Sequence, residues 1–157
     1  MTLRKKVQEK LDKLTTAPAT IVVDADVGHF EADIDQLEQL GCTFLRFQLS
    51  SDHLAGASRD RLQKLGDDLS ARLNYLMEPI APLEFDQEGF TLQLRSDPPA
   101  RDDDGSTYYE ILARRDGVLS LHRYRKPPGQ PRQAIAAQVT REVFSRLVGD
   151  FEESVQP

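Results

Sequence analysis

The stretch from Ser106 to Arg125, STYYEILARRDGVLSLHRYR, indicates the fold class because it predicts two strands joined by a tight turn. Asp116-Gly117 is a dipeptide preferred in two-residue hairpin turns. Aromatic and aliphatic residues on both sides of it favour strands. Strands joined in this way are antiparallel, so the sequence favours an antiparallel sheet over a doubly wound parallel one.

A second hairpin is predicted upstream, from PLEFD (82–86) and EGFTLQLRS (88–96). Its turn is expected between Gln87 and Gly89. Strand alternation predicts which side chains face the core. The expected inward set is Leu83, Phe85, Phe90, Leu92 and Leu94, and the outward set in the second strand is Thr91, Gln93 and Arg95.

Three more strands are predicted nearer the N-terminus. TIVVDADV (20–27) is the first. Residues 29–40 fit a second strand, although a helix over 31–40 competes because Ile34, Leu37 and Leu40 also have helical spacing. CTFLRFQL (42–49) is the third strand. Its alternation places four residues toward the core: Thr43, Leu45, Phe47 and Leu49.

Leucine-rich stripes predict three amphipathic helices. They cover residues 3–14, residues 58–77 with Ser58 as N-cap, and a C-terminal segment capped by Thr140. Residues 1–157 are therefore expected to form a single α+β domain, an antiparallel sheet with the three helices mainly on one face. This element order resembles that of type III secretion chaperones, a resemblance that implies binding of a protein partner.

Charge and composition limit the function classes. The 157 residues carry a net charge of −6, which opposes binding to nucleic acid and to anionic lipid. One cysteine, Cys42, excludes an internal disulfide, and the absence of a leader-like or long apolar segment predicts a cytoplasmic protein without a membrane span. Six acids in 24–38 and six bases in 114–132 are expected to neutralise one another within the chain or across a dimer.

The segment IVVDADV (21–27) resembles the first motif of haloacid dehalogenase-type phosphatases. The resemblance implies that Asp24 is a nucleophile, that Asp26 is a proton shuttle, and that both help to hold Mg²⁺. It also implies a second-motif hydroxyl at Ser50 or Ser51 and a lysine at Lys64. The alternative is that both aspartates form the solvated face of an amphipathic strand.

Five outward side chains of the two hairpins form the candidate ligand-binding set: Arg95, Tyr108, Glu110, His122 and Tyr124. If the hairpins adjoin, these side chains share one sheet face, and Glu110 and His122 become an acid and base pair if they lie opposite each other. An ordinary solvated face with cross-strand ion pairs is the alternative.

No metal or cofactor site is predicted with the leading interpretation. The aspartates of RSDPPARDDDGSTYYE (95–110) lack the first and last ligands of a calcium loop, so this segment is expected to be a mobile, solvated connection. The leading hypothesis is a binding or interaction module without catalytic activity. The long leucine stripes also favour a protein partner or self-association.

Overall fold

The computed structural model describes residues 1–86, 88 and 90–157, which form three helices and a ten-stranded sheet. The elements are α1 (Leu3–Lys13), β1 (Ala19–Ala25), β2 (Gly28–Leu37), β3 (Gly41–Ser50), α2 (Arg59–Arg72), β4 (Ile80–Asp86), β5 (Thr91–Ser96), β6 (Ala100–Asp102), β7 (Gly105–Arg114), β8 (Val118–Lys126), β9 (Gln133–Ile135), β10 (Ala137–Thr140) and α3 (Arg141–Val155).

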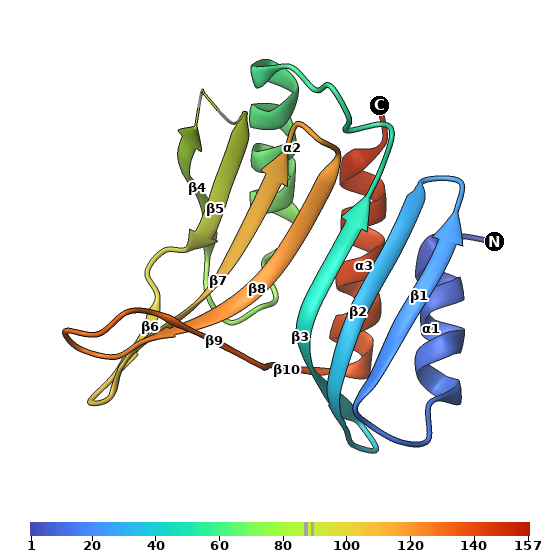
Figure 1. Ribbon diagram of the computed structural model, residues 1–157, viewed down its shortest axis with the longest axis horizontal. Coiled ribbons are helices and arrows are strands. Elements are labelled where there is room, and N and C mark those ends of the chain that lie inside the picture. The colour runs from blue at the N-terminus through green and yellow to red at the C-terminus, as the bar shows by residue number, and fades with distance from the viewer. Residues whose placement is uncertain (87, 89) are drawn as a thin grey trace.

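The sheet has the strand order β1-β2-β3-β8-β7-β5-β4, and three short strands pair beside this path (Figure 1). Each strand pair in the described residues is antiparallel. The predicted α+β class is therefore confirmed. The turn predicted at Gln87 and Gly89 lies outside the described residues, although β4 and β5 on either side of it pair as expected.

One row of buried side chains runs across the middle of the sheet. Register places Phe47 of β3, Leu121 of β8, Ile111 of β7 and Leu94 of β5 side by side. The rings of Phe144 and Phe151 in α3 meet Phe47 edge-on at centroid distances of 5.4 and 5.1 Å. Gly66 of α2 approaches Leu92 and Leu94 so closely that a Cβ there would lie 2.5 Å from Leu92 Cδ2. Both helices therefore cover the same face of the sheet, behind it in Figure 1.

The first and last helices are joined at their ends. The backbone N–H groups of Leu3 and Arg4 donate to the Glu152 carboxylate of α3 at 3.0 and 3.2 Å. The first turn of α1 contains no acidic residue, so α3 supplies the negative charge that a helix N-terminus favours. The side chain of Thr2 completes the cap by accepting from the Lys5 N–H.

The central and C-terminal helices begin where their caps predict. Ser58 Oγ accepts from the Arg61 N–H, and Thr140 Oγ1 accepts from the Val143 N–H. However, α2 ends at Arg72 rather than at residue 77. Leu76 remains 5% exposed although it lies beyond the helix. The apolar stripe therefore reaches the core partly through a non-helical segment.

Extra residues in two strands reverse part of the predicted side-chain alternation. The β2–β3 register skips Leu45, which is 44% exposed, and Cys42 and Phe44 face the core in place of Thr43 and Leu45. In β4 the register skips Leu83, which is 47% exposed rather than inward. Residues 28–37 form a strand, so the competing helix is excluded.

The turn of the β7–β8 hairpin and the connection that precedes this hairpin both differ from the prediction. The turn between β7 and β8 is one residue longer than the predicted two-residue turn. The Gly117 N–H donates to the Arg114 carbonyl, and within this turn only Gly117 has a positive φ, at +101°. A type I′ turn would need positive φ at both central residues.

Residues 100–107 form a small hairpin rather than a mobile connection, and Asp102 accepts hydrogen bonds from the Asp104 N–H and from Arg125.

Candidate functional site

The five predicted ligand-binding residues lie together on the sheet face opposite α2 and α3. Glu110 of β7 is directly opposite His122 of β8 on one side and Arg95 of β5 on the other. Tyr108 and Tyr124 are also cross-strand partners, with ring centroids 5.9 Å apart. The prediction that these side chains adjoin is thus correct in register.

Glu110 is the best buried charged group of this set, with a side chain that is 2% exposed. Its Oε2 accepts from Arg132 Nη1 and from Gln93 Nε2, both at 2.7 Å. Both donors bind the same carboxylate oxygen, and no hydrogen bond to His122 is assigned in the described residues. The hypothetical acid and base pair with His122 is therefore not formed, although the two residues lie opposite.

Arg132 is the residue that sequence reasoning missed. It follows the proline-rich turn after β8, and its guanidinium lies 3.8 Å above the centre of the Tyr124 ring. The hydrogen bond to Glu110 raises the pKa of Arg132. Arg95 lies 5.1 Å above the Tyr108 ring in a similar way. Two stacked arginines thus cover the two tyrosines, an arrangement that fixes all four side chains.

The pKa of His122 lies below the ordinary value of an imidazole, which favours the neutral form. Burial lowers its pKa, and the nearby cations Arg132 and Arg46 act in the same direction, whereas the Glu110 charge opposes them. A neutral imidazole can donate through one nitrogen and accept through the other. His122 is thus suited to hydrogen bonding rather than to supplying a positive charge.

A pocket of about 540 Å³ opens beside Glu110, between β4, β5, β7 and Arg132. This Glu110 pocket is lined by Glu84, Phe85, Asp86, Gln93, Glu110 and Arg132, among others. Three carboxylates against one guanidinium give these residues a formal charge of −2. In the described part of the chain, neither Glu84 nor Asp86 has an ion pair assigned, although Asp86 Oδ1 accepts from the Glu88 N–H at 3.1 Å.

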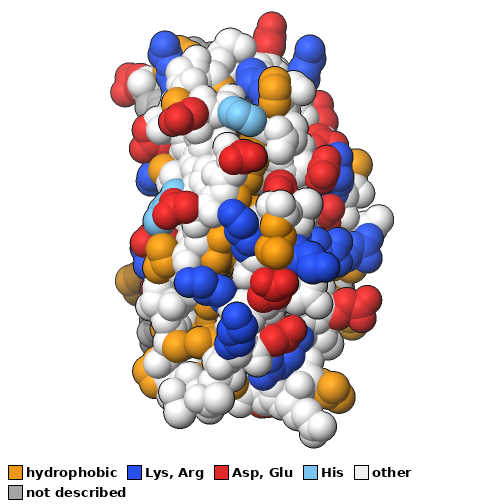
Figure 2. All heavy atoms as spheres, turned by 90° about the vertical axis from the view of Figure 1, so that its right-hand side faces the viewer, with side chains coloured by type: hydrophobic (Ala, Val, Ile, Leu, Met, Phe, Trp, Pro, Cys, Tyr) orange, Lys and Arg blue, Asp and Glu red, His pale blue; other side chains and the backbone are white. Residues whose placement is uncertain are grey.

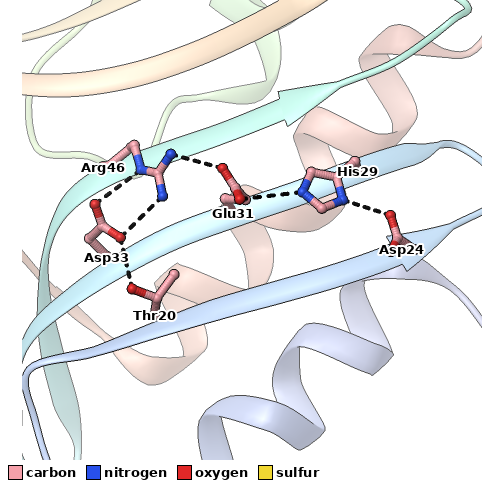
Figure 3. A network of polar contacts seen from close by, with 6 residues as sticks. All are labelled: Thr20, Asp24, His29, Glu31, Asp33 and Arg46. Carbon is pink, nitrogen blue, oxygen red and sulfur yellow. Dashed lines mark hydrogen bonds and ion pairs between the residues drawn. The ribbon is translucent and has the colours of Figure 1, made fainter.

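The acidic stretch of β1 and β2 finds its partners locally, as Figure 3 shows. Arg46 of β3 bonds Glu31 at 2.8 Å and Asp33 at 3.0 Å. His29 contacts Asp24 at 2.6 Å and Glu31 at 3.4 Å; the hydrogen bond to Asp24 and then the one to Glu31 raise the pKa of His29.

The bases of residues 114–132 pair elsewhere, with Glu78, Asp102, Asp104, Glu110 and Asp116. The expected neutralisation between the two segments within one chain is therefore wrong.

The phosphatase resemblance is not supported by the fold. Asp24 lies on the edge strand β1 with a side chain that is 82% exposed, and Asp26 is exposed in the β1–β2 turn. The motif requires the end of a parallel strand, whereas these strands are antiparallel. Ser51 donates to the Val27 carbonyl, and Lys64 is an exposed residue of α2. In the described residues, no group of three or more His, Cys, Asp or Glu side chains is arranged to hold a metal ion.

Cys42 is buried at 1% exposure, and burial raises its pKa to about 11. The thiol is therefore a core group rather than a nucleophile. Among the described residues, no helix is long and apolar enough to cross a membrane.

Comparison with family models, with curated proteins and with solved structures finds no match for this chain.

Proposed function

We propose that this protein is a cytoplasmic binding module without catalytic activity, and that the Glu110 pocket binds a small cationic ligand. The pocket volume of about 540 Å³ suits a small molecule, because ligand sites commonly enclose about 300–1,000 Å³. The observation that carries the proposal is that Glu84 and Asp86 line the pocket with no ion pair assigned in the described residues, beside the buried Glu110 carboxylate.

An amine or guanidine is the ligand chemistry that these walls favour. Carboxylates bind such groups through charge-assisted hydrogen bonds, and a guanidinium meets a carboxylate in two parallel bonds. Arg132 is fixed by Glu110 and stacked on Tyr124, so it closes one side of the pocket and repels a cation from that side. The ligand's positive end is expected near Glu84 and Asp86.

Amide chemical shifts of ¹⁵N-labelled protein test this proposal, with agmatine and spermidine as probes and succinate as an anionic control. We expect saturable shifts in β4, β5 and β7 with the cations only. The double substitution Glu84→Gln with Asp86→Asn changes exposed side chains and should weaken agmatine binding at least tenfold.

Asp52→Asn with Asp103→Asn removes the same charge from exposed positions outside the pocket and serves as the matched control. Equal weakening by both double substitutions would show that net charge alone is responsible. The proposal would also fail if none of the cations caused saturable shifts in these strands at millimolar concentration.

A further inference from the structure

The two edges of the sheet differ in how open they are to another strand. β4 contains Pro82, the extra residue Leu83 and the acids Glu84 and Asp86, features that hinder pairing at an edge. β1 instead pairs with β2 residue for residue along its whole length, without an extra residue. Its first five residues, 19–23, carry no charge.

The outer side of β1 presents backbone groups in the pattern that strand addition requires. A two-residue turn closes on the Ala25 and Gly28 pair, so Ala25 and every second residue before it bond to β2. The N–H and C=O groups of Thr20, Val22 and Asp24 consequently point outward. Of these groups, the Asp24 carbonyl accepts from Lys6 Nζ at 3.1 Å, and the others have no hydrogen bond assigned within the described residues.

A groove of about 370 Å³ runs along this edge, between β1 and α1. Four residues of α1 and three of β1 line it, with Val22 and Val23 on the strand side. The α1 side contributes Lys6, Lys10 and Lys13 against Glu9, and with Asp24 on the strand side the lining has a formal charge of +1. Helix and strand run in opposite directions, as Figure 1 shows, so the end of α1 lies beside the start of β1.

The groove is basic although the whole protein is acidic. Lys10 and Lys13 lie in the last turn of α1 and are exposed. Figure 2, which faces this edge, shows several Lys and Arg side chains in the middle and lower part of the view, with Asp and Glu side chains among them. The net charge of −6 makes this local excess of lysine a specific feature of the edge.

We propose that β1 accepts an extended acidic segment of a partner protein as an additional antiparallel or parallel strand. Main-chain hydrogen bonds to Thr20 and Val22 would provide affinity, and alternate acidic side chains would contact Lys10 and Lys13. A second copy of this chain fits less well. Pairing β1 with its own copy would bring two lysine-lined helices together on the same side of the sheet, which like charges oppose.

Fluorescence anisotropy tests the proposal with a labelled peptide of alternating Glu and Val residues and a counterpart that has Lys in place of every Glu. We expect only the acidic peptide to bind, and its binding should weaken when salt rises from about 50 to about 300 mM. Lys10→Glu with Lys13→Glu should weaken binding at least tenfold. Lys5→Glu with Lys64→Glu reverses two exposed charges outside the groove and should leave binding unchanged.

Val22→Pro should abolish binding, because it removes one outward N–H that the added strand would need. The variant should still fold, because an edge strand tolerates proline where its N–H faces solvent. The charge-reversal pair keeps the test decisive if this variant fails to fold. Equal binding of both peptides, or no effect of the Lys10 and Lys13 change, would overturn the proposal. It would also be overturned if sedimentation showed a dimer of this chain that Val22→Pro dissociates.

Discussion

Deleting the Arg132 side chain tests whether Glu110 is a buried charge that depends on its partner. Breaking a buried ion pair by removing one member costs about 3–5 kcal/mol, whereas an exposed pair contributes about 0.2–1 kcal/mol. Glu110 is 2% exposed and Arg132 is 42% exposed, so this pair lies between the two limits. Gln93 would still donate to the carboxylate.

For Arg132→Ala we therefore expect a loss of about 2 kcal/mol from the ion pair. The lost stacking on Tyr124 adds about 0.5–1 kcal/mol. For a chain of this length, the sum lowers Tm by roughly 5–10 °C. Urea and thermal unfolding followed by circular dichroism measure the loss, since the chain contains no tryptophan.

Arg114→Ala is the matched control, because Arg114 is 43% exposed and pairs with the exposed Asp116 at 3.3 Å. Its loss should stay below about 1 kcal/mol. In a Glu110→Gln background, Arg132→Ala should cost mainly the stacking contribution. The reasoning is refuted if Arg132→Ala and Arg114→Ala destabilise equally, or if Glu110→Gln leaves the cost of Arg132→Ala unchanged.

Three further predictions concern single residues. Thr43→Val should raise the unfolding free energy by about 1 kcal/mol in denaturant titrations, since Thr43 Oγ1 is buried without a hydrogen-bond partner in the described structure. Gly28→Ala should cost more than about 2 kcal/mol, because φ is +154° and a Cβ would lie 2.1 Å from a β3 carbonyl oxygen; Gly56→Ala, with open space around it, should cost about 1 kcal/mol. Burial lowers the pKa of His122 below 6.5, so the unfolded chain takes up the proton first and stability falls as pH drops from about 6.5 through the folded pKa. NMR titration of the imidazole resonances should show this, and should show His29 titrating above 6.5.

Local sequence signals account for most of the fold. Predictions that depend only on neighbouring residues are correct. They are the helix caps at Ser58 and Thr140 and the strand on either side of Asp116-Gly117. The alternation in β3 fails at Leu45 because an extra residue reverses which face each side chain takes. Nothing in the composition of a strand marks where such a residue is inserted.

The candidate site was predictable only in part, because some of its contacts depend on tertiary packing rather than on neighbouring residues. Tyr108, Glu110, His122 and Tyr124 lie in register because the turn has three residues, whereas the predicted two-residue turn at Asp116-Gly117 would place Glu110 opposite Arg123. Arg132 reaches Glu110 from a proline-rich segment whose path depends on tertiary packing. The short strands β6, β9 and β10 have three or four residues each, too few for a periodic pattern.

The contact between Glu152 and the start of α1 also has a consequence for protein synthesis. α1 is made before α3, which supplies the cap of α1 almost 150 residues later in the chain. An isolated helix of eleven residues is marginal in water. We therefore expect the stripe of Leu3, Val7 and Leu11 to remain exposed on the ribosome until α3 has emerged, so that a nascent-chain chaperone can bind it throughout that interval.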